Sequence, residues 1–262
     1  MTFTLATFNV NSLNQRLPHL LAFAQENPVD VICLQEIKCE TEKFPRAAIE
    51  DAGFNVAILG QKSYNGVAIL SRFVIEETIE GLPGDDTDLQ ARFLECVIGA
   101  PMGPVRVGGL YLPNGNPIES EKFPYKLRWM DRLIAFTQAR LKLEEPFILA
   151  GDFNVIPRSE DCYDPKMWVS DALFQPESRN KYRQLLNFGM VDCFMAVDGR
   201  ANQYTFWDYQ AGAWPKDHGI RIDHILANSV AADRLESCSI VRKMRAREKP
   251  SDHVPIMAQF AL

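Results

Sequence analysis

The sequence predicts an α+β fold in which helices lie outside two packed, mostly antiparallel sheets. Short apolar runs rich in β-branched residues recur along the chain, and several follow one another without an intervening helix. Strands that are close in sequence pair most simply as antiparallel neighbours. The few segments with helical spacing interrupt these runs, so we expect them to cover the outer faces of the sheets.

Ten segments combine apolar and β-branched residues over strand-like lengths and are expected to form strands. They are Phe3–Val10, Val29–Gln35, Gly66–Ser71, Ala91–Ile98, Val105–Leu112, Pro146–Ala150, Tyr204–Trp207, Arg221–Ala227, Cys238–Lys243 and Val254–Phe260. Helices are predicted where apolar residues recur at helical spacing or where end signals are present. The predicted helices are Gln15–Gln25, Thr41–Asp51, Leu127–Leu143 and Ser178–Asn187.

Length and composition favour a single domain over residues 1–262. The chain is 47% hydrophobic, which is enough for one large core, and no Gly/Ser-rich or Pro-rich stretch offers a linker. Residues 1–16 lack the cationic start and apolar run of a signal peptide, and no apolar stretch approaches the roughly 20 residues of a membrane helix. We therefore expect a cytoplasmic protein without a membrane partner, and a monomer by default.

The cysteines are scattered along the chain, and none forms a C-x-x-C pair. This spacing argues against a zinc site and against thiol redox chemistry. Reduced thiols in a cytosolic protein are the simplest interpretation. The residues concerned are Cys33, Cys39, Cys96, Cys162, Cys193 and Cys238.

The formal net charge of −6 is unfavourable for a nucleic-acid-binding protein, because phosphate contacts normally require Lys and Arg. A bound cation can reverse the local field at a site, and basic residues can gather on one face. The basic segment, residues 242–249, stands just before Ser251-Asp252-His253. Two interpretations stay open for this segment: a DNA-contacting patch and an ordinary solvated turn.

Five polar clusters follow apolar strands, where a rigid scaffold passes into a loop and function tends to collect. Asn9 and Asn11 share a face if the first strand continues, although an Asn pair also forms turns. Glu36 follows a buried strand, where a carboxylate is costly unless it is paired or metal-bound. Its carboxylate suits a hard divalent cation, and a solvated strand end is the alternative.

Two further clusters add hydrogen-bond donors and an acid. Tyr111 stands before Leu-Pro-Asn-Gly and could donate to a phosphate oxygen, or pack at a turn. Asp152 and Asn154 alternate to one side after the strand Phe147-Ile148-Leu149. An acid beside an amide can orient a water and hold a phosphate oxygen, whereas an Asx turn is the structural alternative.

The fifth cluster, Ser251-Asp252-His253, precedes the final strand, and Asp223 supplies an acid that could orient the His253 ring. Each cluster alone is weak, but their combination and order resemble the exonuclease III family of apurinic/apyrimidinic endonucleases, within the endonuclease/exonuclease/phosphatase superfamily. The resemblance runs from Thr4 to the C-terminus. It is carried by Phe8-Asn9-Val10-Asn11, Leu34-Gln35-Glu36-Ile37-Lys38, Gly109-Leu110-Tyr111-Leu112-Pro113-Asn114-Gly115, Gly151-Asp152-Phe153-Asn154, Tyr204-Thr205-Phe206-Trp207-Asp208-Tyr209, Arg221-Ile222-Asp223-His224 and Ser251-Asp252-His253.

This resemblance implies a four-layered α/β sandwich of two packed, mostly antiparallel sheets flanked by helices, with the active site at one end of the sheets. It implies an AP endonuclease and 3′-5′ exonuclease that uses Mg²⁺, with Mn²⁺ as a possible substitute. The implied partner is double-stranded DNA with abasic sites or 3′ ends. The chemistry is consistent, because a phosphodiester is anionic and repels hydroxide until a metal neutralises its charge.

The same resemblance implies a role for each motif residue. Asp152 would position or deprotonate the attacking water, and Asn154 and Tyr111 would grip the scissile phosphate. His253, paired to Asp223, would stabilise charge on the phosphoryl oxygens. Whether Asp152 or His253 is the general base stays open. The resemblance further implies Glu36, Asn9 and Asp252 as metal ligands and Asn11, Lys38 and Asn114 as substrate-binding residues.

Selection of damaged DNA requires room for a sugar that has lost its base. Phe206, Trp207 and Ile222 could wall an apolar pocket beside the metal, into which a normal nucleotide would enter only by unstacking. Core packing is the alternative for Trp207. Ile220 stands where some relatives carry a larger aromatic residue, which leaves the tightness of the pocket open. His224 receives no role.

Two rival functions stay open for this sequence. A phosphoesterase of the same superfamily could act on inositol phosphates or phospholipid head groups, but Thr205–Tyr209 and the basic segment argue against it. A non-catalytic DNA-binding scaffold would not need the complete catalytic set. Loop shape, at Ser63–Asn65 and Gly212–Gly219 among others, decides the balance of abasic-site incision, 3′-to-5′ exonuclease and 3′-phosphatase activity.

Overall fold

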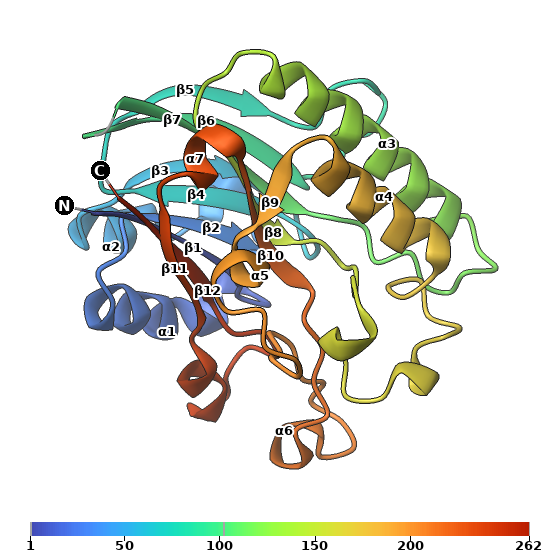
Figure 1. The fold of residues 1–262 in the computed structure, drawn as a ribbon. Coiled ribbons are helices and arrows are strands. Elements are labelled where there is room, and N and C mark those ends of the chain that lie inside the picture. Colours follow the sequence, from blue (N-terminus) through green and yellow to red (C-terminus); the bar gives the residue numbers. More distant parts are fainter. Residues whose placement is uncertain (1, 102, 262) are drawn as a thin grey trace.

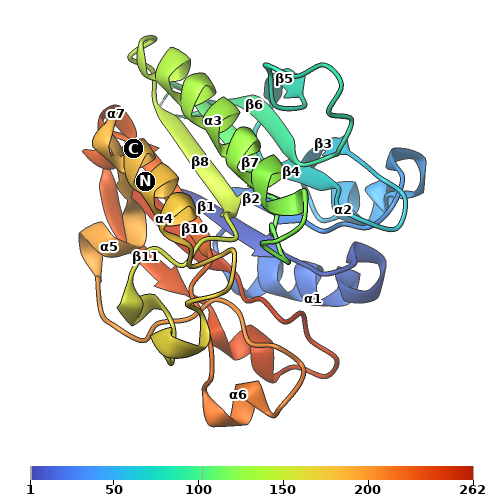
Figure 2. The same ribbon diagram turned by 90° about the vertical axis from the view of Figure 1, so that its right-hand side faces the viewer.

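The structure, a computed structural model, describes residues 2–101 and 103–261. Within these ranges the strands form two six-stranded sheets that pack face to face, with helices outside them (Figure 1 and Figure 2). In spatial order, the first sheet contains β11 (Leu235–Ile240), β12 (Ile256–Ala261), β1 (Thr2–Asn9), β2 (Val31–Gln35), β4 (Val67–Ser71) and β3 (Asn55–Leu59). The second contains β5 (Ile75–Glu80), β6 (Phe93–Ala100), β7 (Gly103–Tyr111), β8 (Phe147–Asp152), β10 (Asp223–Asn228) and β9 (Met190–Asp192).

Most neighbouring strands run antiparallel. Among the strands of the described ranges, the parallel pairs are β1–β2 and β7–β8. Each parallel pair is joined by a long connection that includes a helix, as parallel strands require. The predicted α+β sandwich of two mostly antiparallel sheets is therefore confirmed.

The central core follows from the alternation of side chains along each strand. In β2, Val31 and Cys33 face the opposite sheet, whereas Ile32 and Leu34 face the helices. Because both faces are covered, every residue of β2 is buried. Fully burying an aliphatic side chain of this size contributes about 1.5–3 kcal/mol, so the apolar runs decide where the layers form.

Helices cover the outer face of each sheet. Apolar residues of α1 (Leu13–Glu26) and α2 (Arg46–Asp51) pack on the first sheet, and those of α3 (Lys122–Leu141) and α4 (Pro176–Asn187) on the second. Figure 2 shows α3 and α4 side by side over β8. In the part of the chain that the structure describes, no helix has the length and apolarity to span a bilayer. The shorter helices are α5 (Cys193–Val197), α6 (Ala213–Lys216) and α7 (Ser229–Ala232).

Three predicted elements differ from the structure. The expected helix Thr41–Asp51 is a 3₁₀ turn followed by α2, because Pro45 separates them and α2 begins at the next residue. The expected strand Tyr204–Trp207 forms only isolated bridges at Phe206. The expected strand Cys238–Lys243 is displaced, because β11 ends at Ile240 and a 3₁₀ turn begins at Arg242.

The sequence prediction also missed β3, β5 and β9. The strand β5 has the sequence Ile-Glu-Glu-Thr-Ile-Glu and lies at the edge of its sheet, where most of its side chains are exposed. Charged side chains are tolerated on an edge strand and hide the usual strand signal. The strand β9 is only three residues long, which is too short for an alternating pattern.

Candidate active site

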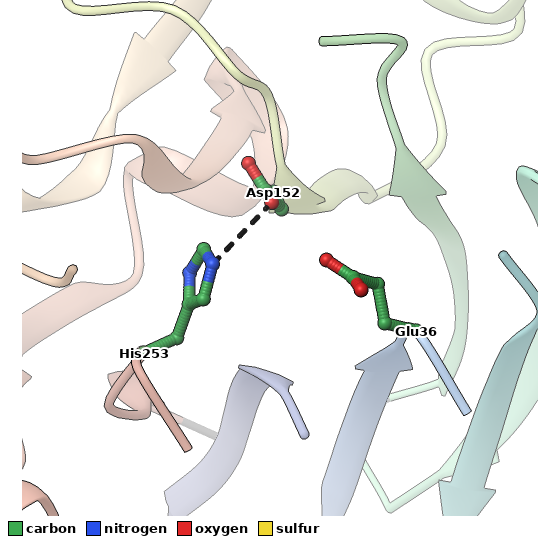
Figure 3. A group of neighbouring side chains, drawn as sticks. All are labelled: Glu36, Asp152 and His253. Atoms are coloured by element: carbon green, nitrogen blue, oxygen red, sulfur yellow. Dashed lines mark ion pairs between the residues drawn. The ribbon is translucent and has the colours of Figure 1, made fainter. Parts of the chain in front are cut away.

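The candidate site lies where strands of both sheets end. Glu36 follows β2, Asp152 is the last residue of β8, and His253 precedes β12. Figure 3 shows these three side chains turned toward one another. One ligand-capable atom from each lies within 4.8 Å of the others. Glu36, Asp152 and His253 are far apart in the sequence and were expected to act together. They meet at one edge of the sandwich.

Asn9, the last residue of β1, joins two of these carboxylates. It is fully buried, and its Nδ2 donates to Glu36 Oε1 at 2.9 Å and to Asp152 Oδ2 at 3.1 Å. Its Oδ1 accepts a hydrogen bond from the backbone N–H of Asn11 at 3.0 Å. In this orientation the amide group of Asn9 fixes the two carboxylates, and its oxygen faces the backbone of Asn11. A role of Asn9 as a metal ligand stays a prediction.

The Glu36 carboxylate is held in its ionised form. Lys38 Nζ lies 2.8 Å from Glu36 Oε2 and also donates to Asn11 Oδ1 at 2.6 Å. Burial raises the pKa of Glu36, but the hydrogen bonds from Lys38 and Asn9 outweigh burial and hold the pKa below its ordinary value. Glu36 and Lys38 both adopt positive φ angles, 50° and 53°, a conformation that non-glycine residues adopt infrequently.

Asp152 is almost completely buried and has the opposite titration behaviour. Its Oδ1 accepts from the backbone N–H of Asn154 at 2.9 Å, and its Oδ2 accepts from Asn9. Burial raises the pKa of Asp152 to about 7, opposed by His253 and reinforced by the charges of Asp223 and Glu36. A carboxylate with this pKa can accept a proton near neutral pH.

His253 forms a buried pair with Asp223, the first residue of β10. The distance between His253 Nδ1 and Asp223 Oδ2 is 2.8 Å, and His253 Nε2 lies 3.8 Å from Asp152 Oδ2, the contact drawn in Figure 3. Burial alone lowers the pKa of His253, but the carboxylate of Asp223, followed by that of Asp152, raises it to about 10. The β10–β8 register places Asp223 directly opposite Asp152, which explains how both acids reach one imidazole.

A row of amides forms another side of the site. Asn154 Nδ2 donates to the carbonyl of Leu112 at 2.9 Å, and Asn114 Nδ2 donates to Asn154 Oδ1 at 3.1 Å. Asn154 has a φ of 46°, in the left-handed region that favours glycine. Burial raises the pKa of Tyr111 well above its ordinary value, so its hydroxyl stays protonated and can donate a hydrogen bond.

These groups line a pocket of about 270 Å³ that also has an apolar side. Nine of its lining residues were candidate site residues in the sequence: Glu36, Tyr111, Asn114, Asp152, Asn154, Phe206, Ile222, Asp252 and His253. Five other lining residues lie in loops without a periodic pattern and had received no role from the sequence, although Asp208 belongs to a motif of the family resemblance: Asn116, Trp168, Asp171, Leu173 and Asp208. Ile220, noted for its size, completes the apolar side.

The remaining predicted site residues lie behind the pocket or at its rim. Asn11 Nδ2 donates to Asp252 Oδ1 at 3.0 Å, and Asn11 Oδ1 accepts from Lys38. Because Lys38 also pairs with Glu36, this chain of contacts links Asp252 to Glu36 at the rim of the pocket. Trp207 does not line the pocket: its side chain is fully buried in the core beneath the first sheet, where its Nε1 donates to Asp217. The prediction that Trp207 binds substrate is therefore wrong, and core packing was the better interpretation.

The basic segment is tied to the body of the protein. Lys243 and Arg247 both pair with Glu26 of α1, at 3.1 and 2.5 Å. Arg245 is buried and donates to the carbonyl of Trp207. Because these cations already have partners within the chain, the geometry favours a structural role for this segment over a DNA-contacting patch.

His224, which received no role from the sequence, belongs to a buried ionic cluster. Arg221 has no exposed surface and pairs with Asp161 and Asp192, both at 2.9 Å, while its Nη1 lies 3.0 Å from His224 Nδ1. Burial, reinforced by the charge of Arg221, lowers the pKa of His224 to about 4. Arg221 and His224 flank Ile222 and Asp223 in the chain, so the cluster supports the start of the strand that enters the site.

The donor set suits a hard divalent cation. Glu36 is ionised and partly accessible, Asp252 lines the same pocket, and both offer carboxylate oxygens. His253 fits less well as a ligand, because its pairing with Asp223 keeps both ring nitrogens protonated near neutral pH. The residues present therefore fit an oxygen-coordinated cation, with Glu36 and Asp252 as the carboxylates that would hold it.

Comparison with known proteins agrees with this site. A model of the endonuclease/exonuclease/phosphatase family matches residues 6–253. The chain is 34% identical to exodeoxyribonuclease III of Haemophilus influenzae, over 97% of this chain and 98% of that protein. A Neisseria 3′ phosphatase bound to a product DNA hairpin has a TM-score of 0.95 and 36% identity, covering 99% of this chain and all (100%) of that one.

A second solved structure gives the same result. An AP endonuclease from Archaeoglobus fulgidus has a TM-score of 0.94 and 36% identity, with 99% of this chain and 100% of that chain covered. The matches extend over nearly the whole chain, and they include both sheets and every strand end that forms the site. The chain therefore belongs to the endonuclease/exonuclease/phosphatase family and, within it, to the exonuclease III type.

Proposed function

We propose that this chain is a divalent-metal-dependent DNA repair nuclease that hydrolyses phosphodiester bonds at abasic sites and at 3′ ends. One observation carries the proposal: the buried acid Asp152 lies between an ionised Glu36 and a charged His253, in a pocket with an apolar side. Hydrolysis of a phosphodiester needs charge neutralisation, an acceptor for a proton of water, and donors for the phosphoryl oxygens. The pocket offers a group for each task.

Asp152 is the proposed acceptor of the proton from the attacking water. Each of its carboxylate oxygens accepts one hydrogen bond within the protein, which fixes the carboxylate and leaves a lone pair on each oxygen for water. Its pKa of about 7 suits a general base near neutral pH. His253 holds its proton in this range, which supports Asp152 as the base of the two candidates.

His253, Asn154 and Tyr111 are the proposed phosphate donors. The Nδ1 hydrogen of His253 is directed at Asp223, which leaves the Nε2 hydrogen for a phosphoryl oxygen. Tyr111 keeps its hydroxyl proton, and Asn154 has one amide hydrogen beyond the one given to Leu112. These donors are fixed before substrate arrives, which lowers the cost of stabilising charge in the transition state.

Magnesium is the proposed cation, with manganese able to replace it. Glu36 and Asp252 would hold it, and the bound ion would neutralise phosphate charge and polarise the scissile bond. Lys38 and Asn9 keep the Glu36 carboxylate ionised and oriented toward that position. Asn11 orients Asp252 in the same way.

The apolar side of the pocket accounts for the proposed choice of damaged DNA. Phe206 packs edge-on against His253, with 4.9 Å between ring centroids, and Ile222 stands directly before Asp223. A sugar without a base can lie against such a wall, whereas an intact nucleotide would first have to unstack. The DNA-bound Neisseria relative supports a nucleic-acid substrate for this pocket. We also propose that the chain acts as a monomeric, cytoplasmic, single-domain enzyme on double-stranded DNA.

The purified protein should be assayed on three DNA duplexes, which carry an abasic site, a plain 3′ end and a 3′ phosphate. Each reaction is run with Mg²⁺ and with EDTA, beside inositol phosphate and phospholipid substrates. We expect metal-dependent cleavage of DNA and no release of phosphate from the soluble esters or lipids. Hydrolysis of the esters with intact DNA would favour the rival phosphoesterase. DNA binding without cleavage of any duplex would favour the non-catalytic scaffold.

A further inference from the structure

We propose that Lys126 is a positioning residue of the nuclease site, whose buried amino group fixes the backbones of Asn114 and Asn154. This inference rests on the proposed function, because it concerns the two amide side chains that line the phosphate side of the pocket. Lys126 itself does not line the pocket. It acts through the two loops that follow β7 and β8.

The contacts of Lys126 define this role. Lys126 lies on the inner face of α3 and has no exposed surface. Its Nζ donates to the carbonyl of Asn114 at 3.0 Å and to the carbonyl of Asn154 at 2.5 Å. One amino group therefore joins the loop after β7 to the loop after β8. The carboxylates of Asp152 and Asp171 attract this group, but the ion pairs found among residues 2–101 and 103–261 do not include Lys126.

The stability of the fold gives little reason for a lysine at the buried position 126. Lysine is among the residues least often fully buried, and a buried ammonium without a paired carboxylate is costly. Two backbone carbonyls accept hydrogen bonds from Nζ but carry no full negative charge. Burial lowers the pKa of Lys126 to about 7, although the charges of Asp152 and Asp171 oppose this effect. An apolar side chain of similar volume would commonly fill such a site at equal or better stability. We therefore attribute the presence of Lys126 to the two loops whose backbone carbonyls it contacts.

The two held loops carry strained or closely fitted backbone. Asn154 has a φ of 46°, and Gly115, next to Asn114, has a φ of 91°. A Cβ added to Gly115 would lie 2.7 Å from Lys126 Cδ, so the lysine stem fits directly against this turn. Strained conformations persist only where the surroundings determine them, and Lys126 supplies a hydrogen bond to each loop.

The amide row depends on the distance between these loops. Asn114 Nδ2 donates to Asn154 Oδ1 at 3.1 Å, and this bond sets the direction in which the remaining amide hydrogen of Asn154 points. If Lys126 is removed, the two carbonyls lose their common donor and the loops can separate. A displacement of about 1 Å in a phosphate-positioning group can reduce turnover by about a hundredfold.

The test compares Lys126→Met with Lys142→Met, a matched control. Lys142 lies at the end of the same helix, is exposed and is remote from the pocket residues. We expect K126M to lower the single-turnover cleavage rate between about tenfold and a hundredfold, with the DNA Kd and the Mg²⁺ requirement within about threefold of wild type. Its Tm should equal or exceed that of K142M. A lower Tm with a normal cleavage rate would make Lys126 a purely structural residue and overturn the proposal.

A double-mutant cycle with Asn154→Ala separates positioning from a general loss of integrity. If Lys126 acts through Asn154, adding K126M to N154A should lower the rate less than K126M does in the wild-type background. Losses that multiply would overturn the proposal. Should K126M fail to fold, the same cycle is run with Lys126→Gln, which retains a single amide donor, and is read by the same criterion.

Wild-type protein in the same assays keeps this inference separate from the proposed function. If wild type cuts none of the DNA duplexes, the proposed function fails. If wild type cuts them and K126M cuts at the same rate, only the role of Lys126 fails.

Discussion

Asp152→Asn tests the proposed chemistry most directly, because it removes a proton acceptor while preserving the shape of the side chain. A positioned general base contributes between about 10² and 10⁴ in rate. These factors correspond to about 2.7 to 5.4 kcal/mol of the barrier at 1.36 kcal/mol for each factor of ten. The variant should therefore cleave DNA at least about a hundredfold more slowly, and its DNA Kd should change little.

The same substitution should stabilise the metal-free protein. Burial raises the pKa of Asp152 from 3.8 to about 7, a difference of about three units, which is worth about 4 kcal/mol against the ionised form. Asparagine carries no charge, but only its oxygen can accept a hydrogen bond. If that oxygen accepts from the Asn154 N–H, the new amide group faces the donor of Asn9, at a cost of about 1–3 kcal/mol. The net gain should be about 1–3 kcal/mol, or a few degrees in Tm.

The pH dependence of this stabilisation has a definite sign. The folded pKa of Asp152 lies above its unfolded value, so wild type loses stability as pH rises from about 4 to about 7. The amide that replaces the carboxyl group does not titrate, because it has no carboxyl proton. The difference in Tm between variant and wild type should therefore grow over this interval and stay constant at higher pH. It should be measured by thermal unfolding with EDTA.

Two results would refute this reasoning. Cleavage by the variant within about threefold of wild type would remove Asp152 from the role of proton acceptor. A Tm difference that does not change between pH 4 and pH 8 would show that the buried charge is not the source of the stability change. Glu160→Gln, an exposed acid outside the pocket, is a suitable control for the loss of one negative charge.

Three other substitutions test separate parts of the site. Glu36→Ala should raise the Mg²⁺ concentration for half-maximal cleavage by at least about tenfold, and an unchanged requirement would place the metal ligand elsewhere. Asp223→Asn should move the alkaline limb of the pH–rate profile to lower pH, because the pKa of His253 falls once its main counter-charge is gone; an unmoved limb would separate His253 from catalysis. Arg221→Met should destabilise the protein by about 3–5 kcal/mol in urea unfolding, because two buried carboxylates lose their cation, and a loss below about 1 kcal/mol would contradict this account.

The sequence predicted those site residues that lie at the ends of strands. Asn9, Glu36 and Asp152 each follow or end an apolar run, and burial of these runs fixes the direction in which the polar residues leave the sheet. Their convergence depends on strand register. Pairing of Asn9 with Gln35 and of Asp223 with Asp152 cannot be obtained from a local pattern. The family resemblance implied only that the polar residues meet at one end of the sheets.

Loop residues of the pocket could not be predicted in this way. Asp171 and Trp168 lie in a segment without periodicity, and its course is set by distant contacts such as the 3.1 Å hydrogen bond from Asn116 Nδ2 to Asp171 Oδ1. The role of the basic segment stayed open for a related reason. Its charge is visible in the sequence, but its partner Glu26 is more than two hundred residues away. Trp207 stands between two exposed or half-exposed neighbours, and only the fold shows that its ring points into the core.

The acidic residues at the site explain how a chain with a net charge of −6 could still bind a phosphodiester. The carboxylates of Glu36, Asp152, Asp223 and Asp252 gather at the site. The cations that pair with them directly are Lys38 and the His253 imidazolium, and the buried Lys126 acts on Asp152 from a greater distance. The remaining excess of negative charge would repel a phosphodiester. A bound divalent cation therefore reverses the effect of the acids instead of adding to an already positive surface. By the same argument, the ion should favour ionisation of Asp152, so that metal binding and the readiness of the proton acceptor are linked.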